Sequence, residues 1–185
     1  VAPQIVDALA ADVQVQLDRF GGVMIYPSTP ESRPALQAAL ATLAYHEITV
    51  EAVSGGGFGS LATASELPEL TELRIGTYIF GDWRSVQLGW AHADQCAMTV
   101  RATVVSANDP TRVILDSGSK ALTADAQDGF HGYIVEYPDA RLYKVNEEHG
   151  FVDMTAYDGL PDVGEAVHVI PVHTCVVTNL HDQLY

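Results

Sequence analysis

Up to residue 83, apolar positions along the chain follow helical and strand spacing in turn. The apolar run at 22–26 ends at a proline, and Ser28-Thr29-Pro30-Glu31 then offers a capping hydroxyl, a proline and an acid for a helix start. The predicted elements are a helix over 8–17, a strand over 22–26, a helix from 28 to 43, a strand over 48–53, a short helix over 63–70 and a strand over 72–80. Such alternation predicts parallel β/α units.

After residue 83 the pattern changes to short runs rich in β-branched residues, separated by turn sequences such as Asn108-Asp109-Pro110 and Asp128-Gly129. The predicted strands cover 98–105, 112–116, 132–137 and 166–170. Short strands joined by such turns are typical of an all-β barrel or sandwich. We therefore expect an α/β plus all-β chain, with a β/α domain over 1–83 and a β domain over 84–185.

The composition is that of a chain which folds without disulfides, because 48% of its 185 residues are hydrophobic. Nine basic residues against 24 acidic ones give a formal charge of −15, which disfavours nucleic acid and anionic membrane surfaces as partners. Two cysteines exclude a multi-disulfide secreted scaffold and favour a reducing, cytoplasmic setting. No apolar run approaches the roughly 20 residues that span a bilayer, and Val1-Ala2-Pro3 lacks signal-peptide character.

Both ends of the chain read as interrupted. There is no initiating Met, and the 176–185 segment reads as a strand that stops in the middle. We therefore expect the chain to be a piece of a longer protein.

A glycine loop follows the strand predicted at 48–53, in the sequence Ser54-Gly55-Gly56-Gly57-Phe58-Gly59-Ser60. Three consecutive glycines let the backbone approach a ligand closely, and their amides together with a following helix suit an anion. In β/α barrels a phosphate group often binds in loops of this kind. The match to a dinucleotide fingerprint is poor, since Ser60 replaces the last glycine. The alternative is a tight turn with no ligand.

A second candidate site is the His-x-Cys pair His173 and Cys175, in Pro171-Val172-His173-Thr174-Cys175. If this segment is a strand, both side chains point to the same face. Imidazole and thiolate then suit Zn²⁺ better than Mg²⁺ or Ca²⁺, and two protein ligands leave open positions for water, substrate or a third side chain. The alternative is a buried cysteine and a hydrogen-bonded histidine in a β core. His149, in Asn146-Glu147-Glu148-His149-Gly150, is a further candidate for acid–base work or for a solvated turn.

Two other features bear on the chemistry. Ser117-Gly118-Ser119-Lys120 matches the nucleophile motif of serine β-lactamases in form, but the partner motifs are absent and a structural turn accounts for it better. Lys120 and Lys144 are the only lysines, and neither sequence context is typical of a Schiff-base lysine.

Several phrases together resemble the D-threonine aldolase and D-serine dehydratase family of alanine-racemase-like, fold-type III enzymes. They are the triple glycine with Ser54, the 72–82 and 116–122 segments, Asn146-Glu147-Glu148-His149-Gly150, Pro171-Val172-His173-Thr174-Cys175 and Asn179-Leu180-His181-Asp182. Their order covers most of the chain from about residue 50 onward. Each phrase is weak alone, but jointly they are specific.

The resemblance implies the C-terminal part of a β/α (TIM-type) barrel that binds pyridoxal phosphate, followed by a β domain, in a homodimer. It places the cofactor phosphate at Gly55, Gly56 and Gly57, with Tyr78 as a neighbour, and a divalent metal, zinc rather than manganese, at His173 and Cys175. The substrate would be a β-hydroxy-D-amino acid whose hydroxyl the metal binds, and the cysteine favours dehydration. The N-terminal half of the barrel, with the Schiff-base lysine, is missing from this sequence.

Three hypotheses about function follow. The first is a lyase acting on β-hydroxy-D-amino acids, of which this chain is the C-terminal part. The second is a catalytically silent metal-binding or dimerisation module of the same fold family. The third is a β-rich ligand-binding domain with no metal.

Overall fold

The computed structural model describes residues 20–185, apart from the side chain of Phe58. The chain divides into two compact units, Val1–Gly76 and Thr77–Tyr185, within which residues contact one another more than they contact the other unit. They are described separately below as the β/α unit and the β unit. The helix predicted over 8–17 lies outside the described residues. Within residues 20–185, no helix is both long enough and apolar enough to cross a membrane.

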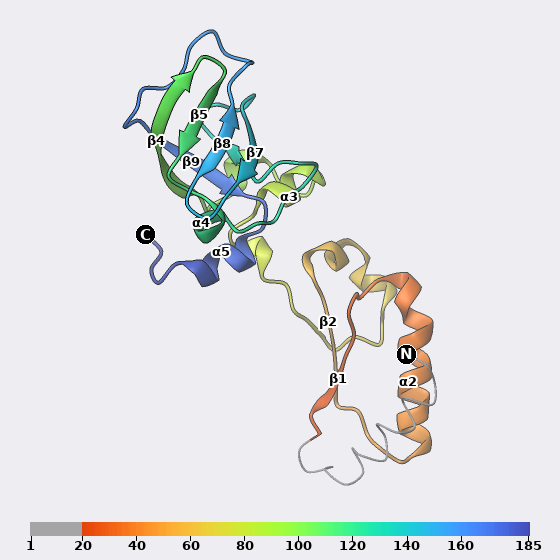
Figure 1. The fold of residues 1–185 in the computed structure, drawn as a ribbon. Helices are drawn as coiled ribbons and strands as arrows, with labels where there is room; N and C mark the ends of the chain where they lie inside the picture. The colour runs from red at the N-terminus through yellow and green to blue at the C-terminus, as the bar shows by residue number, and fades with distance from the viewer. Residues whose placement is uncertain (1–19) are drawn as a thin grey trace. The chain divides into compact units, whose positions relative to one another are not determined.

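The β/α unit contains a parallel three-stranded sheet in the order β1-β2-β3. Figure 1 labels β1 and β2 of this sheet. Its elements are β1 (Gly22–Met24), η2 (Pro30–Ser32), α2 (Arg33–Tyr45), β2 (Ala52–Gly55), η3 (Phe58–Glu66) and β3 (Glu72–Leu73). Helix α2 connects β1 to β2, and its buried Leu43 packs with Ile48 and Val23. The prediction of parallel β/α units is thereby confirmed, whereas a complete barrel stays a prediction.

Two predicted elements of this unit differ in extent from those observed. The strand expected over 72–80 is only two residues long, because Gly76 and the 3-10 helix η4 (Thr77–Ile79) follow it. The helix expected over 63–70 begins earlier and is the 3-10 helix η3. It starts at Phe58, directly after the three consecutive glycines, so backbone amides of the glycine loop and of a helix start lie together.

The β unit is a six-stranded antiparallel sheet in the order β6-β9-β4-β5-β8-β7. The strands are β4 (Val100–Asp109), β5 (Arg112–Leu115), β6 (Gly132–Ile134), β7 (Arg141–Val145), β8 (Gly150–Asp153) and β9 (Ala166–Pro171). The two edge strands approach each other, since the amide of His131, just before β6, donates to the Leu142 carbonyl of β7 at 2.9 Å. The sheet is therefore a nearly closed β-barrel, and all four predicted strands overlap strands of this barrel.

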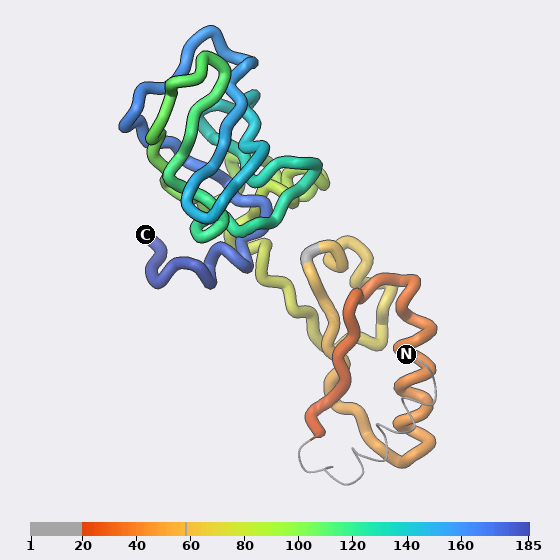
Figure 2. The backbone as a smooth tube through the Cα atoms, viewed as in Figure 1, coloured from red at the N-terminus to blue at the C-terminus, as the bar shows by residue number. Residues whose placement is uncertain are grey.

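The core of the β unit is the interior of this barrel. Leu122, Leu142, Val152 and Val169 are fully buried there, and Val177 packs with them from α5 (Thr174–Leu180). The remaining helices of the unit are α3 (Trp83–Gln87), η5 (Ala93–Gln95) and α4 (Ser119–Leu122). The backbone tube shows β9 leading directly into α5 (Figure 2).

The boundary between the units falls between Gly76 and Thr77, before the expected boundary at residue 83. The 77–83 segment belongs to the β unit because a ring stack and a backbone hydrogen bond join it to other residues of that unit. Trp83 stacks on Tyr133 of β6 with 4.3 Å between ring centroids. The Phe80 carbonyl accepts a hydrogen bond from the amide of Ala97 at 2.6 Å.

Candidate functional site

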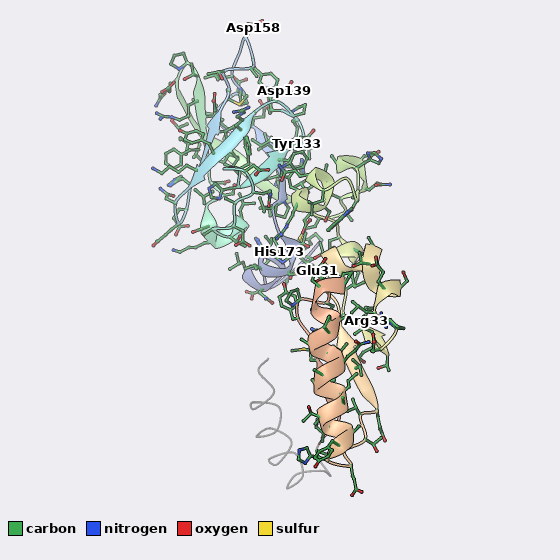
Figure 3. All side chains as sticks on the ribbon, turned by 90° about the vertical axis from the view of Figure 1, so that its right-hand side faces the viewer. Glu31, Arg33, Tyr133, Asp139, Asp158 and His173 are labelled. Atoms are coloured by element: carbon green, nitrogen blue, oxygen red, sulfur yellow. The ribbon has the colours of Figure 1, made fainter. Side chains whose placement is uncertain are left out.

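His173 and Cys175 lie at the junction of β9 and α5. Figure 3 shows His173 at one end of the β unit. Strand β9 ends at Pro171, His173 caps the N-terminus of α5 with extended backbone angles, and Cys175 is in the first turn of that helix. The prediction of one extended segment is therefore wrong, and the same-face argument from strand periodicity does not apply. The predicted strand over 176–185 is wrong for the same reason, since α5 extends to Leu180.

One short segment of the β unit contacts both of these side chains. The hydroxyl Oγ1 of Thr77 lies 3.5 Å from Sγ of Cys175, and Oδ2 of Asp82 lies 3.2 Å from Nδ1 of His173. Thr77 and Asp82 stand at the two ends of a turn in which the Thr77 carbonyl accepts a 2.8 Å hydrogen bond from the amide of Gly81. We refer to residues 77–82 as the bracket segment. Through Thr77 and Asp82, this one turn contacts both the thiol of Cys175 and the imidazole of His173.

Asp82 is the most buried charged group of this site, with its side chain 2% exposed against 33% for His173. Its Oδ1 accepts hydrogen bonds from the amide and the hydroxyl of Ser85, so Asp82 is the N-cap of α3. Its Oδ2 is the atom that faces His173. Both carboxylate oxygens are therefore occupied, and the side chain is fixed from two sides.

The electrostatics of this pair favour its charged form. Burial would raise the pKa of Asp82, but the hydrogen bonds from His173 and Ser85 outweigh burial and lower that pKa below its ordinary value. The hydrogen bond to Asp82 raises the pKa of His173, against the opposing effect of burial. An ionised carboxylate only accepts hydrogen bonds, so Nδ1 of His173 is the donor and Nε2 is the nitrogen left for another partner.

Cys96 also contacts Asp82 and was not singled out from the sequence as a site residue. Its thiol donates weakly to the backbone carbonyl of Asp82 at 3.7 Å, and it is half-buried, whereas Cys175 is exposed. Burial raises the pKa of Cys96, and the charges of Asp82 and Asp94 add to this effect. The two cysteines are both free thiols.

The described residues supply two candidate metal donors but not a complete ligand set. Among residues 20–185, no group of three or more His, Cys, Asp or Glu side chains is arranged to hold a metal ion. His149 lies in the exposed turn between β7 and β8, where its backbone amide donates to the side chain of Asn146 at 2.7 Å. His149 therefore lies in a solvated turn, which is one of the two alternatives that the sequence offered for it; the other was acid–base work.

The glycine loop in the β/α unit is tightly packed against its own neighbours. The amide of Gly56 donates to Oγ of buried Ser28 at 2.8 Å, and the carbonyl of Gly55 accepts from the amide of Arg74 at 2.8 Å. A Cβ at Gly56 would lie 2.5 Å from the backbone nitrogen of Arg74, and the φ of +126° also requires glycine. Packing within the chain thus explains two of the three glycines.

Gly57 differs from the other two glycines. Its φ is +134°, and a Cβ there would meet only the Tyr26 ring at 3.5 Å and Ser60 Oγ at 3.9 Å. Its carbonyl accepts a hydrogen bond from the amide of Ser60 within η3. Of the three, Gly57 therefore has the most open surroundings for a close approach by a ligand.

The remaining sequence candidates have ordinary surroundings. Tyr78, expected near the cofactor phosphate, lies in η4 with 64% of its surface exposed. Lys120 binds Glu148 at 2.5 Å and Lys144 lies over the Phe151 ring, and both lysines are exposed. Ser117 is buried while Lys120 points to Glu148, so the pair cannot act together as a nucleophile and base.

The family is identified from sequence comparison. Residues 97–185 match a family model described as "Putative serine dehydratase domain". The chain is also 32% identical over 178 residues to D-threonine aldolase from Arthrobacter sp., covering 91% of this chain and 46% of the aldolase. The chain belongs to the D-serine dehydratase-like family. It spans about half the length of that aldolase.

A shorter protein matches this chain over most of its own length. An uncharacterized protein of Mycobacterium tuberculosis is 38% identical over 113 residues, which is 57% of this chain and 84% of that protein.

Solved structures agree on the fold of the D-serine dehydratase-like family. D-threo-3-hydroxyaspartate dehydratase from Delftia sp. HT23 covers 97% of this chain with a TM-score of 0.74 and 25% identity, and this chain covers 56% of it. An Ala racemase-like protein from Idiomarina loihiensis gives a TM-score of 0.77 at 21% identity, with coverage of 98% and 56%. Two variants of D-threo-3-hydroxyaspartate dehydratase are also similar. One replaces a histidine with alanine, and the other, in the metal-free form, replaces a cysteine two positions further along.

Proposed function

We propose that the chain is part of a lyase that acts on β-hydroxy-D-amino acids with pyridoxal phosphate and a divalent metal, zinc rather than manganese. Similar proteins are named D-threonine aldolase and D-threo-3-hydroxyaspartate dehydratase, and both names refer to β-hydroxy-D-amino acids. The chain covers about half of each relative, so the activity would be that of a longer polypeptide, which would act as a homodimer.

The observation that supports this proposal most is the hydrogen bond between Nδ1 of His173 and buried Asp82, two residues before Cys175. The histidine and cysteine replaced in the solved dehydratase variants are two positions apart, as His173 and Cys175 are, and the cysteine variant was solved in a metal-free form. Imidazole nitrogen and thiolate sulfur form a donor set that suits zinc. With only two donors, the site would keep positions open for water or substrate.

The chain's own residues then have distinct tasks. His173 and Cys175 would bind the metal, which when bound polarises the substrate's β-hydroxyl as a Lewis acid. The glycine loop would hold the phosphate of pyridoxal phosphate, which when bound supplies an electron sink for a substrate carbanion. Of Gly55, Gly56 and Gly57, we assign the main phosphate contact to Gly57, because the Gly56 amide already donates to Ser28. Tyr78 stays a weaker candidate neighbour.

The amine for a Schiff base is expected outside these residues. Lys120 is engaged by two glutamates, and Lys144 is exposed above an aromatic ring. Neither lysine is desolvated, and desolvation is one way in which proteins activate a lysine for this chemistry. A second part of the enzyme would therefore carry that lysine.

Metal analysis of the purified chain tests the metal assignment. The chain is incubated with Zn²⁺, dialysed and analysed for bound metal. The His173→Ala, Cys175→Ala double variant is expected to lose the bound zinc, because both proposed donors are removed. His168→Ala removes a histidine of the same barrel and is expected to keep it. Equal zinc in the double variant and the unchanged chain overturns the assignment.

A catalytically silent metal-binding or dimerisation module is a second candidate, favoured by the short relative. The Mycobacterium tuberculosis protein is 84% covered by 113 residues, whereas a complete β/α barrel takes roughly 250 residues. Mass spectrometry of the natural gene product separates the two functions. A longer polypeptide with a lysine-bearing β/α region favours the lyase, and a product of this length favours the silent module. Turnover of D-serine and D-threonine by the natural product then distinguishes dehydratase from aldolase.

A further inference from the structure

Two side chains of the bracket segment, residues 77–82, contact the two proposed metal donors. Thr77 Oγ1 reaches Cys175 Sγ at 3.5 Å, and Asp82 Oδ2 reaches His173 Nδ1 at 3.2 Å. Thr77 and Asp82 are both buried. Two buried polar side chains from one turn therefore meet the only two side chains to which the proposed function assigns the metal.

Asp82 is built to hold a fixed orientation. The amide of Ser85 donates to Oδ1 at 2.8 Å, the hydroxyl of Ser85 donates to the same oxygen, and Ser85 is itself 1% exposed. Rotation of the carboxylate would break the N-cap of α3 and leave two buried donors without a partner. The oxygen that remains, Oδ2, is thus directed at His173.

This arrangement selects one nitrogen of the imidazole. Nδ1 of His173 donates to a carboxylate, and the ring of His173 is one-third exposed, so Nε2 is the nitrogen that remains for a metal. Metal-bound histidines commonly donate their other ring N–H to a carboxylate, which fixes the ring and increases its basicity. A hydroxyl next to Cys175 can in turn donate to the sulfur once the thiol is deprotonated.

We propose that Asp82 is a positioning residue that presents Nε2 of His173 to the metal, and that Thr77 supports Cys175 in the same way. The inference rests on the proposed metal site and adds the residues that prepare it. The bracket segment would then couple the two donors, because Thr77 and Asp82 are joined by a single turn.

A matched control exists in the same barrel. His168 of β9 also pairs through Nδ1 with a carboxylate, Oε1 of Glu136, at 2.6 Å. The Glu136 side chain likewise accepts a backbone amide, that of His168, at 2.8 Å. Both side chains of this pair are substantially exposed, and no cysteine lies two residues further along. Glu136→Ala therefore removes a carboxylate from a histidine without touching the proposed site.

The experiment is a zinc titration of the metal-free 185-residue chain against a competing chelator. Asp82→Ala is expected to lower zinc affinity by about 10- to 100-fold, the usual effect of losing such an outer partner. Asp82→Asn keeps only one acceptor oxygen, which the two Ser85 donors occupy, so its amide NH2 would face Nδ1 and the loss of zinc affinity should be similar to that of Asp82→Ala. Glu136→Ala should bind zinc as the unchanged chain does, and Thr77→Val should show a smaller loss than Asp82→Ala.

Two further readouts separate positioning from general damage. Nitrogen NMR of the metal-free chain, at a pH where the ring is neutral, should show His173 protonated at Nδ1, and Asp82→Ala should produce a mixture of tautomers. With Co²⁺ in place of Zn²⁺, the thiolate charge-transfer band should persist in Asp82→Ala at saturating metal, since Cys175 still binds. Circular dichroism and the unfolding midpoint establish that each variant is folded at the titration temperature.

The outcomes distinguish this inference from the proposed function. Unchanged zinc affinity in Asp82→Ala, or an equal loss in Glu136→Ala, overturns the positioning role while leaving the metal site intact. Unchanged affinity in His173→Ala overturns the metal site and the positioning role together. A loss in Asp82→Ala with an unaltered tautomer also overturns the positioning role, because Asp82 would then not act through His173.

Discussion

Two histidines of the β unit, five residues apart in the sequence, each pair with a carboxylate, and the two pairs differ in burial rather than in chemistry. His168 and Glu136 are 2.6 Å apart, with side chains 46% and 34% exposed. His173 and Asp82 are 3.2 Å apart, with side chains 33% and 2% exposed. The shorter contact is in the exposed pair, where water competes for both partners.

The difference shows that distance alone does not rank polar contacts. Removing Glu136 leaves groups that water can reach, so little free energy is lost. Removing Asp82 leaves buried donors of Ser85 without any partner, and it also removes the cap of α3. The buried pair is therefore the one that the fold depends on, whatever binds at His173.

The largest expected effect is on the stability of the metal-free chain. Asp82→Ala should lower the free energy of unfolding of the β unit by about 3 kcal/mol, the sum of a lost helix cap and unpaired buried donors. Glu136→Ala should lower it by about 0.5 kcal/mol, as is usual for an exposed pair. Urea unfolding followed by tryptophan fluorescence measures both. Equal losses in the two variants would mean that burial does not distinguish the pairs.

The second effect is the pH dependence of that stability, measured with a chelator present. The pKa of His173 is raised in the folded chain, mainly by its hydrogen bond to Asp82, so its contribution is full below the ordinary value of 6.5 and is lost as pH rises through the folded pKa. The pKa of Asp82 is lowered although burial opposes this, so its contribution is lost only as pH falls through a value below 3.8.

The stability difference between the unchanged chain and His173→Ala should therefore be largest between those limits. It should shrink when the pH is raised from below 6.5 to well above the raised pKa of His173. His168→Ala provides the comparison and should change stability by no more than about 0.5 kcal/mol at either pH, because its pair is exposed. A difference for His173→Ala that grows with pH would contradict the assigned direction of the pKa shift.

The same contrast explains which parts of the molecule could be predicted from sequence. The barrel strands β4, β5, β6 and β9 were predicted because β-branched runs between turn residues are a local signal. Strands β7 and β8 were missed, since Arg141–Val145 and Gly150–Asp153 are short and include charged residues. The parallel β/α units were also predictable, because helical and strand spacing alternate in that region.

Helix α5 was predicted wrongly because its local propensity favours a strand. Its sequence Thr-Cys-Val-Val-Thr is rich in β-branched residues, yet Val177 is buried in the barrel core and His173 caps the helix. Tertiary packing therefore outweighed propensity. The residues of the candidate pair were predicted correctly as candidates, but the geometry that joins them was not.

Asp82 carried almost no signal of its role. Its partner His173 lies 91 residues away in the sequence, and no spacing rule connects them. The only local hint was an Asp followed three residues later by Ser85 at the start of a helix, which is typical of an N-cap. That pattern predicts a helix start but says nothing about the opposite carboxylate oxygen, which only the fold directs at the imidazole.

The smallest expected effect is that of the buried Asp82 charge on Cys96, a residue other than its partner His173. Asp82 is one of the charges that raise the pKa of Cys96, after burial, and the thiolate is the form that reacts with iodoacetamide. In a Cys175→Ala background, which leaves Cys96 as the single thiol, Asp82→Asn should lower the pH midpoint of Cys96 alkylation and speed the reaction severalfold near neutral pH. Glu136→Gln should leave the midpoint unchanged.

Asn at position 82 keeps the volume of the side chain, so a change in midpoint reports the lost charge more directly than Asp82→Ala would. A charge in a buried site is weakly screened and acts over several ångströms, whereas an exposed charge such as that of Glu136 is screened by water and salt. Raising the salt concentration should therefore alter the alkylation of Cys96 only slightly in the unchanged chain. If salt abolished the difference in Cys96 alkylation between the unchanged chain and Asp82→Asn, the Asp82 charge would act through solvent. Asp82 and Glu136 would then differ in their effect on Cys96 because of their positions rather than their burial.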